Sequence, residues 1–396
     1  MLRSRPVRLA LAVLALAVLP ALAAAAPRNL LLNPGFEEGL AGHEWMPAGW
    51  DTSVSGLPTV FFGRDTFLVH SGAWSVSVAN ASALIPMGHN WSQRVLVGRE
   101  AWGKDLVFRV WTRNNGVEGR AYVLLQAYRD TISKMATLWN VERDEAMRRL
   151  RLTRVDDPLI DLGWARQVFT DRETGWVQRE VRVYCPPSVN VIFVRVGLWG
   201  TGQVLLDDAS LTLESAKPAK AAKMGEDLFA GDGGFERGLD AWELAMPPYD
   251  GMRVELDTTV ARSGRASVRA QSGTGYFVET RSGVGRVLCN RALAGSRVRL
   301  SGHLKTDSLK SVAWCVLYAH TVRGVVQLPQ PETFNGTHDW TFTSHEMDLP
   351  ADTYAVWAWF NYNAPNPGRV WFDDLRLEVI GKAKDPKALP PRPPGR

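Results

Sequence analysis

Cysteine is scarce in this sequence, with three residues among 396. Cys185, Cys289 and Cys315 can form at most one internal disulfide, so the chain is not a disulfide-rich framework. Cys289 and Cys315 fall in the same half of the chain and could pair, although an alternating pattern also places Cys315 inside a strand, where a lone buried thiol is ordinary. With no CxxC pair and no histidines at ligand spacing, the sequence argues against a zinc site.

The chain also has little net charge once its first residues are set aside. Arg3, Arg5 and Arg8 precede an uncharged run, rich in Leu, Ala and Val, that ends at Ala26. This pattern predicts a secretory signal peptide cleaved after about Ala23. An uncleaved membrane anchor is the alternative, because the run is near the lower length limit for a membrane span.

Cleavage at that point lowers the formal net charge of +5 by three. No basic stripe with interleaved aromatic residues remains, so we expect no nucleic-acid partner. The expected location is outside the cytoplasm, either secreted or periplasmic, with no membrane span in the processed chain.

Local catalytic motifs are absent as well. The sequence contains no GxSxG nucleophile elbow, no HExxH zinc motif and no phosphate-binding loop. The ExDxxE spacing of a β-sandwich glycosidase is missing too, since ERDEAM at Glu142 lacks the last acid. We therefore expect a non-catalytic protein. A polysaccharide hydrolase or lyase is the alternative, because a pair of carboxylates can also assemble from distant strands.

What the sequence does contain is an internal duplication. GFEEGL at Gly35 returns as GFERGL at Gly234. Three further blocks recur in the same order: HSGAWSVSV and RSGRASVRA, AYVLLQAY and AWCVLYAH, and VLLDDASLTLE and VWFDDLRLEVI. Four matches in one order indicate two tandem copies of one fold.

The segments that join and follow the copies differ in composition from the copies themselves. ESAKPAKAAKMGED, which begins at Glu214, has no apolar periodicity and is typical of a linker. The last segment carries five prolines and predicts disorder. We therefore expect a signal peptide (1–23), a first module (27–215), a linker (216–226), a second module (227–381) and a disordered tail (382–396).

Short alternating strands dominate both copies. LVFRVWTRN at Leu106 and VRLSGHLKT at Val298 alternate with a period of two, as half-buried strands do, and turn clusters separate such runs. A helix is expected over Asn140–Leu152, whose acidic start and basic end suit the helix dipole. It belongs to an insertion, about 131–172, that the second copy lacks. The pattern predicts an all-β fold of two tandem antiparallel sandwiches with a small helical insertion in the first.

The repeated motifs carry a resemblance to a known family. NLLLNPGFEEGL, the tryptophan that follows it, the HSGAWSVSV segment and the closing VLLDDASLTLE resemble the carbohydrate-binding modules of the CenC type, which are galactose-binding-domain-like jelly rolls. The second copy departs from this pattern by replacing NPGFE with GDGGFE. The resemblance implies tandem jelly rolls that bind a polysaccharide or other glycan without cleaving it. An envelope scaffold or protein-interaction module with no sugar site is the alternative.

Two pairs of adjacent aspartates lie within the closing strands. A buried carboxylate is costly unless it accepts hydrogen bonds or binds a cation. The family resembled often carries a structural calcium that joins the first strand to the last, and oxygen ligands suit calcium. By position, the resemblance nominates Glu37 with Asp207 or Asp208, and Glu236 with Asp373 or Asp374. The alternative is that these acids only accept hydrogen bonds at the strand ends.

Sixteen tryptophans are the other excess. The alternation in AWCVLYAH and AVWAWFNYN places aromatic and polar residues on the face opposite a small or aliphatic row. Sugar rings pack their C–H groups on aromatic faces, and their hydroxyls pair with amides and charged groups. The candidate sugar-binding residues are Trp314, Tyr318, His320, Trp357, Trp359 and Asn361 in the second copy, with Tyr122, Gln126, Tyr128, Arg195 and Trp199 in the first. The same two strips could instead be covered by the other copy or by the insertion.

Overall fold

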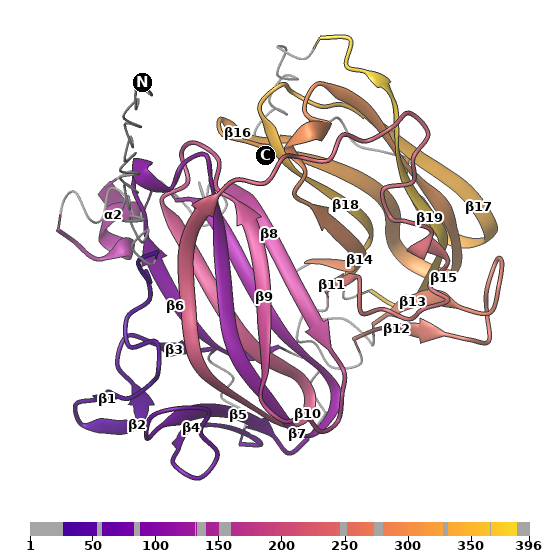
Figure 1. Cartoon of the computed structure of the whole chain (residues 1–396). Helices are drawn as coiled ribbons and strands as arrows, with labels where there is room; N and C mark the ends of the chain where they lie inside the picture. The colour runs from indigo at the N-terminus through magenta and orange to yellow at the C-terminus, as the bar shows by residue number, and fades with distance from the viewer. Residues whose placement is uncertain are drawn as a thin grey trace, which may run out of the picture.

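The computed structural model describes residues 27–53, 58–82, 88–130, 132, 140–149, 160–245, 252–272, 280–327, 332–364 and 366–385. These residues form two antiparallel β-sandwiches that lie side by side (Figure 1). The expected all-β fold of two tandem sandwiches is confirmed. The predicted signal peptide (1–23) and the residues 386–396 of the predicted tail lie outside the described residues.

The strands of the first module are β1 (Gly39–Leu40), β2 (His43–Pro47), β3 (Asp51–Thr52), β4 (Val60–Asp65), β5 (Ser75–Asn80), β6 (His89–Leu96), β7 (Lys104–Arg129), β8 (Ile160–Phe169), β9 (Val177–Tyr184) and β10 (Val191–Ser215). A 3-10 turn at Arg99–Ala101 precedes β7. The helix α2 covers Arg143–Arg149, within the range expected to be helical. None of the helices in the described part of the chain has the length and apolar character that a membrane crossing requires.

The strands of the second module are β11 (Glu243–Ala245), β12 (Arg253–Asp257), β13 (Ser267–Gln271), β14 (Thr280–Leu288), β15 (Ser296–Thr321), β16 (Gly324–Gln327), β17 (Phe334–Asp348), β18 (Thr353–Ala364) and β19 (Arg369–Lys382). Two further 3-10 turns lie at Asp232–Gly234 and Arg291–Leu293.

Long strands pass from one layer of each sandwich to the other. In the first module the strand order is β3-β6-β10-β5-β4, and β7 runs along β10 while also pairing with β8 and β9. The corner falls where Gly119 pairs with Gly200. Both have positive φ, and a Cβ at Gly200 would lie 2.1 Å from the Glu118 carbonyl oxygen. Only glycine permits two backbones to approach so closely while they bend.

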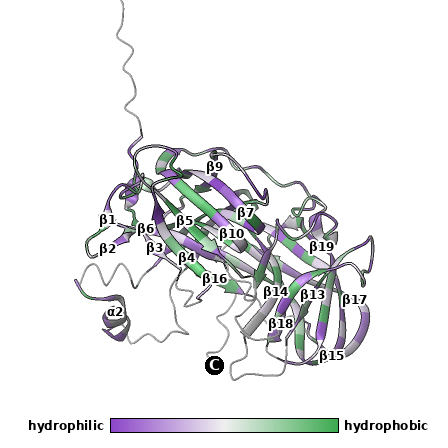
Figure 2. Cartoon of the chain, turned by 90° about the horizontal axis from the view of Figure 1, so that it is seen from below, coloured by the Kyte–Doolittle hydropathy of each residue, from purple (hydrophilic) through white to green (hydrophobic). Residues whose placement is uncertain are grey.

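The second module repeats this topology. Its strand order is β11-β14-β18-β15-β19-β13-β12, with β16 and β17 also paired to β15. Strands β18 and β19 take the place of the single bent strand β10. Each module encloses its own apolar core, the first from Leu31 to Leu211 and the second from Phe229 to Val379. The strands show alternating hydrophobic and hydrophilic bands (Figure 2), which is the period-two pattern of half-buried sheets.

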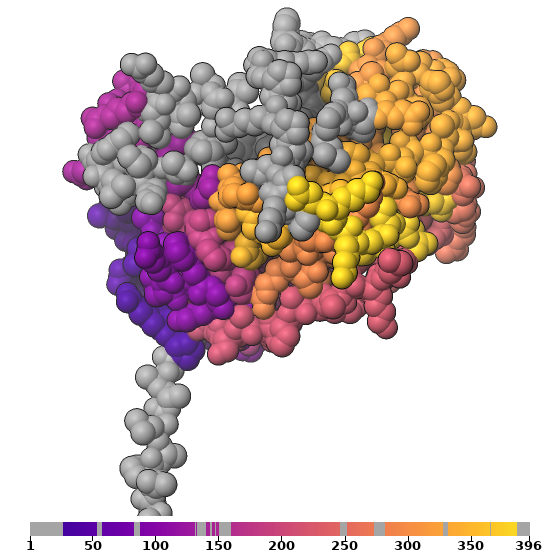
Figure 3. Space-filling model, turned by 90° about the horizontal axis from the view of Figure 1, so that it is seen from above, coloured from indigo at the N-terminus to yellow at the C-terminus, as the bar shows by residue number. Residues whose placement is uncertain are grey.

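The two modules contact one another along one side (Figure 3). Arg166 of β8 donates to the carbonyl oxygens of Asp240 and Trp242 at 3.3 and 2.9 Å. The predicted linker is anchored at the same junction, since Arg291 donates to the Lys217 carbonyl at 3.0 Å. The junction therefore combines direct contacts between the modules with contacts to the segment that joins them.

Candidate functional site

A pocket of about 330 Å³ opens on the second module, on the face of β15 and β18 that points away from its core. Its lining residues are Tyr318 and His320 from β15, Trp357, Trp359 and Asn361 from β18, Val325 from β16 and Ala245 from β11. All the candidate residues of the second copy line this pocket except Trp314, which is 8% exposed and lies outside the lining.

Strand register explains why these side chains meet. Tyr318 of β15 pairs with Trp357 of β18, and Gly285 of β14 pairs with Trp359. Directly opposed residues in an antiparallel pair point to the same face of the sheet. A Cβ at Gly285 would lie 2.4 Å from the Trp359 ring, so this ring covers the β14 backbone. The glycine is what allows the indole to lie flat against the sheet.

The pocket floor is a row of aromatic rings. Trp357 and Trp359 have ring centroids 6.3 Å apart and an interplanar angle of 42°. His320 stacks on Trp357 with centroids 4.9 Å apart and an angle of 13°. Both tryptophans are partly exposed, while the next residues on the other face, Val356 and Ala358, are buried in the core. The two indoles therefore offer ring surface to a ligand.

Two polar residues border this floor. Asn361 is 3% exposed and supplies an amide, and His320 is 7% exposed. Burial lowers the pKa of His320 to about 4, and a hydrogen bond to the Asp161 backbone opposes part of that shift. His320 is therefore neutral at pH 7, and the pocket presents an uncharged polar edge beside its aromatic rings.

The depressed pKa of His320 makes stability depend on pH. Because the pKa of His320 is about 4 in the folded chain and near 6.5 when unfolded, the unfolded chain binds the proton more readily. The contribution of neutral His320 to the free energy of unfolding is fully present above about pH 6.5 and is lost as the pH falls toward 4. The whole transition is worth about 3 kcal/mol. Urea unfolding of wild type and His320→Gln across this window checks it, and the gap between the two pH profiles is the His320 contribution. Parallel profiles would contradict the burial of a neutral ring.

The candidate strip of the first module has a different environment. Tyr122, Gln126 and Tyr128 are buried, whereas Arg195 and Trp199 are partly exposed. The Tyr122 hydroxyl accepts from Asn90 Nδ2 at 3.0 Å, and burial raises the pKa of Tyr122 to about 12. Gln126 Nε2 donates to the Tyr128 hydroxyl at 2.5 Å.

These polar groups are thus engaged with one another. The adjacent Arg120 lies 5.1 Å over the Trp199 ring and donates to Leu239 of the second module. Burial of Tyr122, Gln126 and Tyr128 and the contact of Arg120 with the second module favour the alternative that the first module's strip is covered.

The acids of the first closing strand hold a turn by hydrogen bonds. Asp207, which is fully buried, accepts from the backbone N–H of His70 at 2.8 Å and of Ser71 at 3.1 Å. Its other oxygen accepts from the Asp208 N–H at 2.7 Å. Asp208 accepts from Ser71 Oγ at 2.9 Å and contacts His70 Nδ1 at 2.6 Å. Burial raises the pKa of Asp207 despite these donors.

The second module repeats this arrangement almost bond for bond. Asp373, also fully buried, accepts from the N–H groups of Arg262 at 2.8 Å and Ser263 at 3.2 Å, and from the Asp374 N–H at 2.7 Å. Asp374 accepts from Ser263 Oγ at 2.6 Å. The duplication seen in sequence is therefore a duplication of a hydrogen-bonded clamp between the Ser-Gly turn and the last strand.

The acids of the two opening motifs are engaged at the same turns. Glu37 accepts from the Ala73 N–H at 3.0 Å, and Glu236 accepts from the Arg265 N–H at 2.7 Å. Backbone N–H groups facing a carboxylate occupy the positions that a cation would need. Within the described ranges, no three His, Cys, Asp or Glu side chains converge on a metal position. The donor set fits the hydrogen-bonding alternative, and calcium stays a prediction from the resemblance.

The cysteines are free thiols, and the suggested pair is not formed. Cys315 is buried in the second core, whereas Cys289 lies at the module junction, where its sulfur accepts the backbone N–H of Trp164 at 2.9 Å.

Sequence reasoning also missed the contact that Trp164 makes with the aromatic row of the second module. This residue of β8 contacts Trp357 with ring centroids 6.1 Å apart. It lies in the insertion of the first copy, and no local pattern links it to a strand far along the chain.

No protein-family model matches the chain, and no curated protein matches it in sequence. One similar solved structure is the tandem CBM22-1–CBM22-2 domain of Paenibacillus barcinonensis Xyn10C, at 15% identity over 91% of this chain and 99% of that chain, with a TM-score of 0.31. TmCBM61 in complex with β-1,4-galactotriose matches at 18% identity over 47% and 99% of the chains, with a TM-score of 0.28. The arabinose-bound α-L-arabinofuranosidase MgGH51 matches at 12% identity over 47% and 26%, with a TM-score of 0.30. At these values the similarities carry no argument about the ligand of this chain.

Proposed function

We propose that the second module binds carbohydrate in the pocket formed by β15, β16 and β18 and does not cleave it. The observation that carries this proposal is the pair of partly exposed indoles, Trp357 and Trp359, lying side by side in one cavity. A pyranose ring has an apolar face of C–H groups that packs on an indole. Its hydroxyls need donors and acceptors, which the Asn361 amide and the neutral His320 ring can provide.

The composition of the pocket favours binding over catalysis. Most glycoside hydrolases place two carboxylates on either side of the scissile bond. Among the described residues that line this pocket there is no Asp or Glu. Aromatic rings without an acid and base can hold a sugar but lack the groups that protonate its leaving oxygen and attack its anomeric carbon. The predicted signal peptide would export the chain. We therefore propose a secreted or periplasmic glycan-binding protein.

Affinity gels test the proposal. The protein is run through native gels that contain one soluble polysaccharide each, including xylan, galactan, mannan and mixed-linkage glucan, with a non-binding protein as the mobility standard. We expect retardation in at least one gel, reversed by free oligosaccharide of the same linkage. Retardation in none of them would reject the proposal and favour the alternative of an envelope scaffold or protein-interaction module. Release of reducing sugar from the retained polysaccharide would instead favour the hydrolase alternative.

A further inference from the structure

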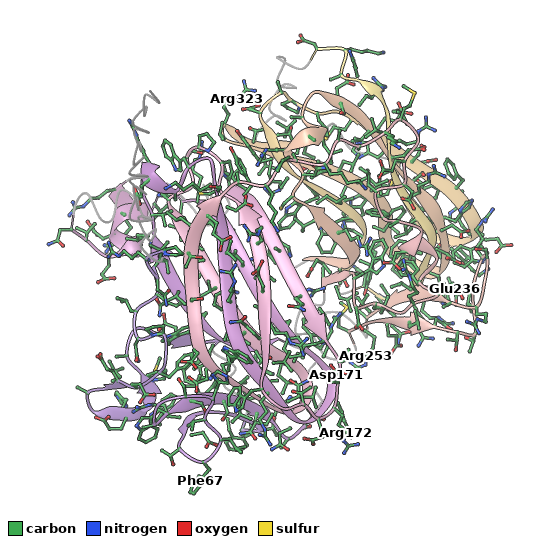
Figure 4. All side chains as sticks on the ribbon, in the orientation of Figure 1. Phe67, Asp171, Arg172, Glu236, Arg253 and Arg323 are labelled. Carbon is green, nitrogen blue, oxygen red and sulfur yellow. The ribbon has the colours of Figure 1, made fainter. Side chains whose placement is uncertain are left out.

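A groove of about 610 Å³, here called the junction groove, lies between the two modules. The first module lines it with residues 164–168 of β8, and the second module lines it mainly with Asp240, Ala241, Glu243 and residues 286–288 of β14. Figure 4 labels Arg323 near the upper end of the boundary between the modules and Asp171, just after β8, near its lower end. Ligand sites occur preferentially at domain interfaces, and this volume is within their usual range.

The junction groove and the aromatic pocket lie on the same face of one sheet. Val287 lines the groove and is directly opposed to Trp357, which lines the pocket. Directly opposed residues of an antiparallel pair point to one face. Glu243 of the groove and Ala245 of the pocket are two residues apart in β11, so they also point to one side of the sheet. The two cavities are therefore neighbours.

Aromatic rings connect the two cavities. Glu243 pairs with Gly285, and Gly285 pairs with Trp359, so the three residues form one row across the sheet. Because the Trp359 ring covers Gly285, the indole extends from the pocket toward the strand that carries Glu243. From the first module, Trp164 lines the groove and meets the Trp357 ring edge-to-face, with centroids 6.1 Å apart and an interplanar angle of 71°. Aromatic surface therefore continues from the pocket into the groove.

The junction groove adds charged groups to this aromatic surface. Arg166 and Glu243 form an ion pair between the modules, with 3.1 Å between Nη2 and Oε1. Asp240 is exposed, and Arg166 contacts its backbone carbonyl at 3.3 Å, which leaves the carboxylate directed elsewhere. Carboxylates accept hydrogen bonds from hydroxyls and guanidinium groups donate to them. A partly exposed indole, that of Trp164, beside such groups is the combination that a sugar ring requires.

We propose that the junction groove is a second subsite for the same glycan chain, which leaves the pocket over Trp357 and Trp359 and continues along β8. The inference rests on the proposed carbohydrate-binding function and extends its site from one module to two. An oligosaccharide too short to leave the pocket of about 330 Å³ gains nothing from the groove. The groove should therefore be detected in the length dependence of binding.

Titration calorimetry on the full chain measures this dependence with β-1,4-linked gluco-, xylo-, manno- and galacto-oligosaccharides of increasing length. In the series that binds, we expect the longest oligosaccharides to bind at least about tenfold more tightly than the shortest. A gain of this size corresponds to one further ring stacked on an aromatic side chain.

Two variants of exposed residues identify the groove as the source of this gain. Asp240→Ala removes a carboxylate from the groove, and Ala241→Leu narrows the groove with a side chain that offers no hydrogen bond. We expect either variant to bind the longest oligosaccharides about tenfold more weakly, at the level of the shortest. Binding of the shortest, measured on the same samples, shows that the pocket is intact. Asp339→Ala is the matched control, because its carboxylate is 86% exposed in β17 and lies outside the groove lining.

Equal affinity of the wild-type chain for short and long oligosaccharides would overturn the inference and leave carbohydrate binding in the pocket. Long-chain binding that both variants retain, or an equal loss for short and long chains, would overturn it as well. Failure of every oligosaccharide to bind, with no retardation in the affinity gels, would reject the proposed function itself.

Discussion

Replacing Trp359 with alanine should weaken glycan binding by about 1–3 kcal/mol, judged by the range for nucleic-acid bases stacked on aromatic side chains, and should leave the melting temperature close to wild type. Trp359 is partly exposed on the pocket face, and its removal uncovers Gly285 and opens no space in the core. Trp357→Ala is expected to lose binding and stability together. Its ring also contacts His320 and Trp164, so its removal takes away one of the contacts between the modules.

Calorimetric titration uses the glycan that retards the protein in the affinity gels and measures the loss of binding. Thermal unfolding of the same variants measures the change in melting temperature. Trp45→Ala is the matched control for truncation of a tryptophan. Trp45 lies in β2 of the first module and is 49% exposed, so its loss should change neither quantity. If Trp359→Ala melts many degrees lower, the ring serves the core. If it melts normally and binds glycan as tightly as wild type, the pocket is not the sugar site.

Removal of the Asp373 carboxylate should cost at least about 1–3 kcal/mol of folding free energy, the range for leaving a buried donor without its acceptor. Asp373 is fully buried and accepts three backbone N–H groups, from Arg262, Ser263 and Asp374. Alanine leaves these donors without partners in the protein interior. We expect Asp207→Ala to destabilise the first module in the same way, because Asp207 accepts the equivalent three bonds.

Urea unfolding of Asp373→Ala, with Asp373→Asn as the conservative control, measures this cost. Asparagine keeps the shape and one acceptor oxygen, so Asp373→Asn should lose less folding free energy than Asp373→Ala. Wild-type stability in Asp373→Ala would show that the clamp contributes little.

The same unfolding curves, recorded with and without a chelator, test whether calcium is bound. A chelator-dependent loss that disappears in Glu236→Ala would support the calcium implied by the resemblance, and an unchanged curve would leave the hydrogen bonds as the only role of these acids.

Strand alternation was enough to predict which face carries Trp357 and Trp359. The side-chain period of a strand is two, so the buried Val356 and Ala358 fix the direction of their neighbours. Alternation says nothing of position along the strand. Trp314 points to the same face as Tyr318, yet it lies beside Asn361, outside the pocket lining. The sequence therefore predicted which face of the sheet carries the aromatic residues. Which of them line the pocket depended on the neighbouring strands, which the sequence pattern does not place.

The paired aspartates show the same division. An acid doublet inside a strand requires one member to point inward, and Asp207 and Asp373 do so. Which member would do so depended on the backbone, because Asp208 and Asp374 adopt positive φ angles of 46° and 52°. Sequence reasoning allowed a strip covered by the other copy, but it could not identify the residues that meet at the junction. The contact of Trp164 with Trp357 joins residues on different modules, and no periodicity records a pairing of that kind.

The contact between the two modules also bears on how such a chain can evolve. Repeated domains usually spread by recombination, one copy at a time, and each copy keeps its properties in a new setting. Here a transferred second copy would leave behind Trp164 and Asp161, which border Trp357 and His320. The transplanted copy would keep its indoles but expose the edge of Trp357 that Trp164 contacts. Selection for a stable Trp357 would therefore conserve the two copies and their spacing as one inherited unit.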